Sequence, residues 1–249
     1  MTGRLQGKVA LISGGSMGMG ASHARAFVAE GAQVVIGDIA DEQGQALVRE
    51  LGDAAHYVHL DVTQFDQWEK AVAITVQRFG KLSTLVNNAG ILTMGPLSDY
   101  SVEQWNRTLA INLTSQFLGM KAALEALTKS APASIINISS TSGLTAHPGL
   151  LGYCASKWGS TGMTKSVALE LADRHIRVNS VHPGAVATPL TQALHPIEDK
   201  DFEGSNLTRF AHPQEISNMV VYLASDESSF STGASFVVDG GLTAGSVIM

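Results

Sequence analysis

A tyrosine and a lysine four residues apart, Tyr153 and Lys157, form a pair that is suited to acid–base chemistry. On a helix, residues at this spacing lie one turn apart on the same face. A free tyrosine has a pKa of about 10, and a nearby ammonium favours the phenolate and lowers that pKa. A phenol tuned in this way exchanges protons efficiently near neutral pH. A solvated pair on a helix surface is the alternative, so the interpretation depends on the rest of the chain.

The elements that must position this pair alternate along the chain. Short β-branched runs indicate strands, and longer segments with apolar residues at helical spacing indicate helices. We expect strands over 8–13, 33–37, 56–60, 83–86, 134–138, 176–180 and 235–238. We expect helices over 18–30, 41–51, 66–79, 102–128, 153–172 and 213–224. This alternation predicts an α/β fold, a Rossmann-type doubly wound parallel sheet with helices on both faces, in a single domain spanning residues 1–249.

The composition limits the classes of partner. Of the 249 residues, 45% are hydrophobic and 15% are charged, and the formal net charge is -6 without any run of Lys or Arg. This balance argues against nucleic acid or a membrane surface as the main partner. The N-terminus carries no apolar signal segment, and a single cysteine, Cys154, fits a reducing compartment, so we expect a cytoplasmic protein. We expect Cys154 to be a small buried residue rather than a nucleophile, because no motif supplies a histidine base.

A glycine-rich turn follows the first expected strand and precedes the first expected helix. Glycines let the backbone approach a pyrophosphate, and the N–H groups at the start of the following helix point at that pyrophosphate. The alternative is a purely structural turn, but its position between strand and helix favours a dinucleotide site. The cofactor-binding residues expected in this turn are Gly14, Ser16, Met17, Gly18, Met19 and Gly20.

Asp38 ends the second expected strand, about twenty residues beyond the glycine-rich turn. A carboxylate at this position accepts hydrogen bonds from the adenosine ribose hydroxyls and repels a 2′-phosphate. Neither Ser16 nor Met17 supplies the basic group that a 2′-phosphate requires. We therefore predict that NAD(H) is preferred over NADP(H), and we expect Ile39 to line the same site. A surface or helix-capping role for Asp38 is the alternative.

With these features the sequence resembles the short-chain dehydrogenase/reductase family over nearly its whole length. The turn matches the family's T-G-x-x-x-G-x-G motif with Ser13 in place of Thr, and residues 87–90 match its N-N-A-G motif. Asp61 and Val62 resemble the family's adenine-contacting pair. The resemblance implies cofactor contacts at Asp61, Val62, Asn88, Ala89, Gly90, Tyr153, Lys157, Pro183, Gly184, Val186 and Thr188.

The resemblance also implies a catalytic tetrad of Asn112, Ser140, Tyr153 and Lys157. The implied reaction is reversible hydride transfer between nicotinamide and the carbon of a ketone or secondary alcohol. Tyr153 would exchange the proton, with its pKa lowered by Lys157, which would also bond the nicotinamide ribose. Ser140 would hydrogen-bond the substrate oxygen. Asn112 would hold a water that links Lys157 to solvent; a satisfied core amide is the alternative.

Within the family, three stretches most resemble bacterial 3α(20β)-hydroxysteroid dehydrogenases: 51–63, 177–184 and 238–241. This likeness implies a hydroxysteroid, a ketosteroid or another bulky hydrophobic ketone as substrate. The segment from about 189 to 212 is expected to form a substrate lid, although its apolar residues could instead pack onto their own domain. These lid residues are Leu190, Leu194, His195, Pro196, Ile197, Phe202, Leu207 and Phe210. Residues that could line the other walls are Met94, Leu144, His147, Leu150 and Leu151.

Two other functions fit part of the pattern. A β-ketoacyl-thioester reductase of fatty acid metabolism shares the fold and the tetrad, but it usually takes NADPH, against which Asp38 argues. A non-catalytic NAD-sensing protein belongs to a different class and would be expected to lack Tyr153 or Lys157. The eight histidines lack metal-ligand spacing, so we predict no catalytic metal. The family also implies a homotetramer, whereas the physiological substrate is not fixed by the sequence.

Overall fold

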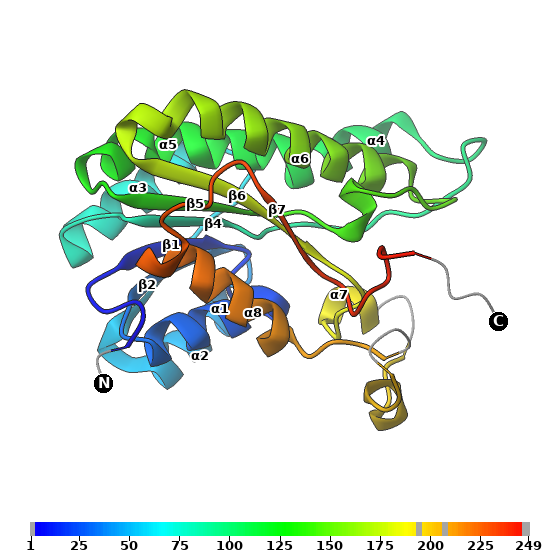
Figure 1. The fold of residues 1–249 in the computed structure, drawn as a ribbon, viewed down its shortest axis with the longest axis horizontal. Coiled ribbons are helices and arrows are strands. Elements are labelled where there is room, and N and C mark those ends of the chain that lie inside the picture. Colours follow the sequence, from blue (N-terminus) through cyan, green and yellow to red (C-terminus); the bar gives the residue numbers. More distant parts are fainter. Residues whose placement is uncertain (1–2, 193–195, 206–208, 246–249) are drawn as a thin grey trace.

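Seven parallel strands form one sheet in the computed structural model of the protein, which describes residues 3–192, 196–205 and 209–245. The order across the sheet is β3-β2-β1-β4-β5-β6-β7, so the chain reverses its direction of progress between β1 and β4 (Figure 1). This confirms the predicted Rossmann-type doubly wound sheet. The strands are β1 Val9–Ser13, β2 Gln33–Asp38, β3 Ala55–His59, β4 Thr84–Asn87, β5 Ala133–Ile138, β6 Ile176–Pro183 and β7 Ser235–Val238.

Helices cover both faces of the sheet (Figure 1). The α-helices of the described residues are α1 Gly18–Ala29, α2 Asp41–Leu51, α3 Phe65–Phe79, α4 Val102–Leu109, α5 Ser115–Lys129, α6 Leu151–Leu171, α7 Pro189–Gln192 and α8 Pro213–Ala224. The helices α3, α4, α5 and α6 lie on one side, and α1, α2 and α8 lie on the other. Within the described ranges, no helix is both long and apolar enough to cross a membrane.

The core consists of two apolar layers, one on each face of the sheet. The central strands β1 and β5 are buried along their whole length, as expected for parallel strands covered on both faces. One layer packs around Phe27 and Ile36, and the other packs around Trp68 and Leu127. The indole N–H of Trp68 donates to the Val62 carbonyl at 2.9 Å, which ties α3 to the loop after β3. The sheet is therefore a rigid base for the loops that leave its carboxyl edge.

The helix expected over 102–128 differs from the prediction because it is interrupted. Its start is well determined, since the Ser101 hydroxyl accepts from the Gln104 N–H at 3.1 Å and the Gln104 side chain accepts from the Ser101 N–H at 2.9 Å. After α4, however, a π turn covers Ala110–Thr114 before α5 begins. A π turn inserts a wider ring of backbone into a helix and is frequent at functional sites. Apolar spacing does not reveal this insertion, which contains Asn112.

Candidate active site

A cleft of about 350 Å³ runs along the carboxyl ends of β1 to β4. This is the edge at which the strand order reverses, where open α/β sheets bind ligands. The cleft brings together most of the residues that the sequence analysis assigns to cofactor binding. These lining residues are Gly14, Met17, Gly18, Met19, Asp38, Ile39, Asp61, Val62, Asn88, Ala89, Gly90 and Thr188.

The glycine-rich turn is shaped for the close approach of a ligand. Gly14 has a φ of 60°, and a Cβ at this position would lie 2.8 Å from the Ala89 Cα. The helix α1 then begins at Gly18 after Met17, which provides no side-chain cap, and its first turn contains no acidic residue. Its first N–H groups and the positive end of its dipole are therefore available to an anion. A pyrophosphate fits this arrangement.

The cleft also offers hydrogen-bond acceptors for the adenosine end of a dinucleotide. The Asp38 carboxylate is held by the Ser16 N–H at 2.9 Å and by the Ala40 N–H at 3.1 Å, one bond to each oxygen. Each oxygen keeps lone pairs for ribose hydroxyls. Asn88 donates its amide to the Gly14 carbonyl at 2.9 Å, whereas its buried Oδ1 has no partner among the described residues. These residues fit the predicted cofactor.

Several lining residues were not identified from the sequence, namely Leu60, Ile91, Arg107 and Ile111. Two sequence features could have identified some of them. Ile91 directly follows the N-N-A-G motif, and Arg107 lies one helical turn before Ile111. Conversely, seven of the predicted cofactor-binding residues do not line the cleft: Ser16, Gly20, Tyr153, Lys157, Pro183, Gly184 and Val186. The Ser16 N–H donates to Asp38, and Gly20 packs closely against the Gly14 carbonyl. Gly184 lines another cavity, of about 300 Å³, together with Asp239.

Three of the four predicted catalytic residues meet where β5 ends and α6 begins. Tyr153 and Lys157 lie in the first two turns of α6, and the Lys157 Nζ is 5.5 Å from the centre of the Tyr153 ring. The Lys157 side chain is 4% exposed and donates to the Ile138 carbonyl at 2.9 Å. The Ser140 hydroxyl interacts with the Tyr153 phenol. A Cβ on Gly90, in the cleft wall, would lie 3.7 Å from Nζ, so the group adjoins the cleft.

Burial controls the protonation of this group. It lowers the pKa of the Lys157 ammonium to about 8. Burial also raises the pKa of the Tyr153 phenol, although the hydrogen bond with Ser140 acts in the opposite direction. The protein's own groups therefore do not produce the low Tyr153 pKa that the sequence analysis expects from Lys157. The Lys157 Nζ lies close to the Tyr153 ring, so the phenolate is favoured most while Lys157 still carries its proton, below a pH of about 8.

Asn112 holds the loop that follows β4 against α6. Its Oδ1 accepts from the Ile91 N–H at 2.8 Å, and its amide donates to the Ile91 carbonyl at 2.9 Å and to the Ser156 hydroxyl at 3.2 Å. The residue is fully buried. These bonds match a satisfied core amide, and they fix the cleft wall beside Lys157. A water held by Asn112 stays a prediction.

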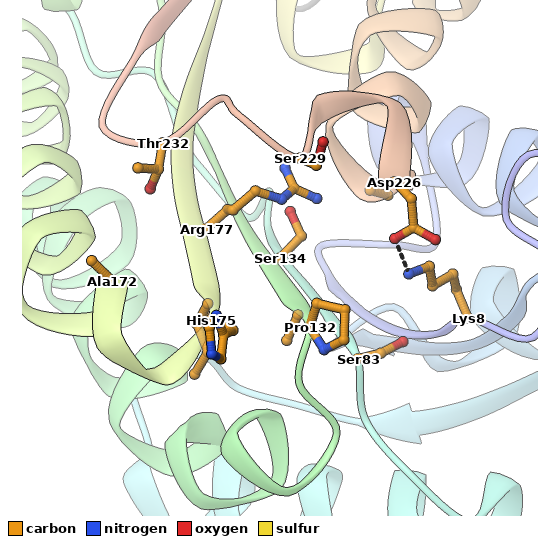
Figure 2. Close-up of a pocket in the computed structure, with 13 residues that line it drawn as sticks. Lys8, Ser83, Pro132, Ser134, Ala172, His175, Arg177, Asp226, Ser229 and Thr232 are labelled. Atoms are coloured by element: carbon orange, nitrogen blue, oxygen red, sulfur yellow. Dashed lines mark hydrogen bonds and ion pairs between the residues drawn. The ribbon is translucent and has the colours of Figure 1, made fainter.

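A second cavity, of about 380 Å³, lies at the amino ends of β4, β5 and β6, at the opposite edge of the sheet (Figure 2). Its charged groups are bonded within the protein. Lys8 donates to Asp226 at 2.6 Å, and Arg177 donates to the Ser228 hydroxyl at 2.6 Å and the Ser225 carbonyl at 3.1 Å. None of the predicted site residues lines this cavity. We therefore locate the candidate active site in the cleft at the carboxyl edge.

Known proteins are similar to this chain in sequence and in fold. A family model described as Enoyl-(Acyl carrier protein) reductase matches residues 14–243. The chain is 57% identical over 245 residues to a Mycobacterium tuberculosis protein named 3-alpha-(or 20-beta)-hydroxysteroid dehydrogenase, with 98% of this chain and 93% of that protein covered. It is 50% identical over 251 residues to the trans-4-hydroxycyclohexanecarboxylate dehydrogenase of Sinomonas cyclohexanicum, with 97% and 95% covered. The crystal structure of a short-chain type dehydrogenase/reductase from Mycobacterium marinum superposes with a TM-score of 0.90 at 34% identity, covering 97% of each chain.

Replacing Gly20 with alanine tests the fit of the glycine-rich turn. The added carbon would lie 2.0 Å from the Gly14 carbonyl oxygen, so the turn must shift. We expect Gly20→Ala to weaken NADH binding at least roughly tenfold, about 1.4 kcal/mol, in a fluorescence titration. Gly162→Ala is the matched control, because nothing lies within 4 Å of its added carbon on another helix. Equal NADH affinities in the two variants would contradict the assignment of the turn.

Proposed function

The chain belongs to the short-chain dehydrogenase/reductase family, and we propose that it interconverts a cyclic or steroidal secondary alcohol and the corresponding ketone with NAD(H). It is an oxidoreductase that acts on CH–OH groups, and the dehydrogenases of its family use nicotinamide cofactors. One observation carries the proposal. Ser140, Tyr153 and Lys157 converge beside a cleft whose turn and carboxylate fit a dinucleotide.

The catalytic roles follow from the donors and acceptors present. A nicotinamide cofactor held in this cleft would supply the hydride chemistry at the substrate carbon. The Tyr153 hydroxyl gives a proton to the substrate oxygen in reduction and takes it back in oxidation. Ser140 offers a hydroxyl beside the phenol, where negative charge develops on that oxygen. Lys157 places a buried positive charge near both, which favours the phenolate at the moment when Tyr153 acts as a base.

A ring-shaped apolar substrate is supported by the relatives and by the surface near Tyr153. The two relatives are named for alcohols that contain saturated rings, a hydroxysteroid in one and a hydroxycyclohexanecarboxylate in the other. Close to Tyr153, the loop 91–100 meets the start of α6 where the Gly95 N–H donates to the Gly149 carbonyl at 3.0 Å. Both segments expose apolar side chains, with Met94 52% and Leu151 41% exposed. These side chains suit the apolar ring of a substrate.

The lid over 189–212 is part of the same proposal. In α7, Leu190 lines the cleft and is 37% exposed, which supports a role in covering a ligand. The Phe202 ring instead stacks on His212, with 4.2 Å between ring centres, so this aromatic residue packs within the lid segment itself. Of the other predicted lid residues, Leu194, His195 and Leu207 lie outside the described residues.

Preference for NAD(H) rests on charge at the adenosine end of the cleft. Asp38 is fixed by two backbone N–H groups and therefore cannot easily turn away from a 2′-phosphate. Among the described residues that line the cleft, Arg107 is the one cation, and it extends from α4 rather than from the turn beside Asp38. Repulsion by Asp38 supports discrimination against NADP(H).

The homotetramer and the cytoplasmic location stay predictions. Large apolar side chains on α5 and α6, including Phe117 at 48% and Trp158 at 51% exposure, are compatible with a subunit interface formed by these helices.

A panel of ketones tests the proposed reaction. We expect NADH-dependent reduction of a substituted cyclohexanone or a 20-ketosteroid with a kcat/KM at least about a hundredfold, roughly 3 kcal/mol, above that for an acetoacetyl thioester. Tyr153→Phe removes only a hydroxyl and should lower kcat by roughly a thousandfold while NADH affinity is unchanged. A preference for the thioester would support the ketoacyl reductase alternative. Retained turnover in Tyr153→Phe would exclude the acid–base role.

Replacing Asp38 with alanine tests the choice of cofactor. Removal of the carboxylate loses its charge-assisted bonds to the ribose and its repulsion of a 2′-phosphate. We expect the ratio of kcat/KM with NADH to kcat/KM with NADPH to fall by roughly 10- to 150-fold, about 1.5 to 3 kcal/mol. Glu42→Ala is the control, since it removes an exposed carboxylate in the following helix. An unchanged ratio in Asp38→Ala would mean that another residue selects the cofactor.

A further inference from the structure

His182 lies beside the candidate catalytic centre without being part of the predicted tetrad. It is the second-to-last residue of β6, and its side chain is fully buried. Its Nδ1 is 2.9 Å from the Ser140 carbonyl oxygen, and its Nε2 is 2.8 Å from the Ser180 hydroxyl oxygen. The imidazole therefore connects the interior of β6 to the residue that interacts with the Tyr153 phenol.

These two partners determine which nitrogen of His182 carries the proton. A carbonyl oxygen only accepts, so Nδ1 must donate to Ser140. The unprotonated Nε2 then accepts from the Ser180 hydroxyl, which lies two residues earlier on the same face of the strand. Burial lowers the pKa of His182, although its bond to the Ser140 carbonyl acts in the opposite direction. The neutral ring with one donor and one acceptor thus satisfies both neighbours.

Where β5 leaves the sheet, the bond from His182 Nδ1 to the Ser140 carbonyl takes the place of a backbone hydrogen bond between β5 and β6. The last backbone bond between the two segments joins the Ser139 N–H to the Val181 carbonyl at 2.8 Å. One residue later the chain turns, and the Ser140 carbonyl receives the Gly143 N–H at 2.9 Å as well as His182 Nδ1. Without the imidazole, the Ser140 peptide would be held to the turn alone.

We propose that His182 is a positioning residue that fixes the Ser140 peptide, and through it the hydroxyl that faces Tyr153. The Ser140 Oγ accepts from the Ser142 N–H at 3.1 Å, so its own proton is free for another oxygen. The Ser140 hydroxyl keeps its orientation toward Tyr153 only while the peptide groups on either side of Ser140 are fixed. A misplacement of about 1 Å in a catalytic group lowers a rate by roughly a hundredfold.

Conservative variants of His182 separate the hydrogen bond made by Nδ1 from the one made by Nε2. Because the readout is enzyme activity, this test rests on the proposed function. His182→Asn keeps an amide donor at the position of Nδ1, whereas His182→Gln keeps polar atoms only at the position of Nε2. We expect His182→Gln to lower kcat about 10- to 100-fold, with NADH affinity within about twofold of wild type. His182→Asn should recover most of this loss. A kcat that falls equally in both variants, or a parallel loss of NADH binding, would overturn the positioning role.

A double-mutant cycle with Ser140→Ala shows whether His182 acts through Ser140. Once the Ser140 hydroxyl is removed, we expect His182→Gln to cause no further fall in kcat. An additive fall would overturn this proposal while leaving the proposed function intact, whereas a normal kcat in Ser140→Ala alone would contradict both. If His182→Gln does not fold, Ser180→Ala takes its place in the cycle. Ser180→Ala removes the partner of Nε2, and it should lower kcat in wild type and not in Ser140→Ala.

Discussion

The buried ammonium of Lys157 is the constraint on which the site depends. A charge that is removed from water is stabilised only by close polar groups, and here the Ile138 carbonyl at the end of β5 supplies the hydrogen bond. Burial lowers the pKa of Lys157 to about 8, within reach of physiological proton exchange. The charge lies 5.5 Å from the centre of the Tyr153 ring, where it opposes the cost of forming a buried phenolate. At an effective dielectric constant of about 20 this attraction is roughly 3 kcal/mol.

The parallel sheet explains how distant parts of the sequence meet around this charge. Parallel strands all end at the same edge, so the turns after β1, β2 and β4 form one cleft while the end of β5 presents Ser140 to α6. Two tethers then set the distance between the cleft and the proton-exchanging group. Asn112 bonds both backbone groups of Ile91, and His182 bonds the Ser140 carbonyl. A site that must align a hydride path with a proton path requires such rigid support.

Local patterns in the sequence predict those parts of the site that local chemistry determines. Glycine spacing predicts the turn, the position of Asp38 at a strand end predicts a ribose acceptor, and the four-residue spacing of Tyr153 and Lys157 places both on one helix face. Tertiary contacts leave no such local signal. The π turn around Asn112 interrupts a helix whose apolar spacing is continuous, and His182 acquires its role from a carbonyl forty-two residues away. Similarly, the high Tyr153 pKa arises from burial, which the helix pattern alone does not indicate.

The pH dependence of alcohol oxidation tests the role of the Lys157 charge most directly. It is measured in wild type and in Lys157→Met, with Tyr153→Phe as the blank. Oxidation needs a base, so its kcat/KM should rise with pH as the Tyr153 phenol gives up its proton, which the nearby Lys157 ammonium favours. Without the ammonium, only a buried phenol remains, and the rise should move upward by about 2 pH units, equivalent to roughly 3 kcal/mol. Superimposable profiles for the two proteins would contradict the claim that the buried charge of Lys157 controls the proton exchanged by Tyr153.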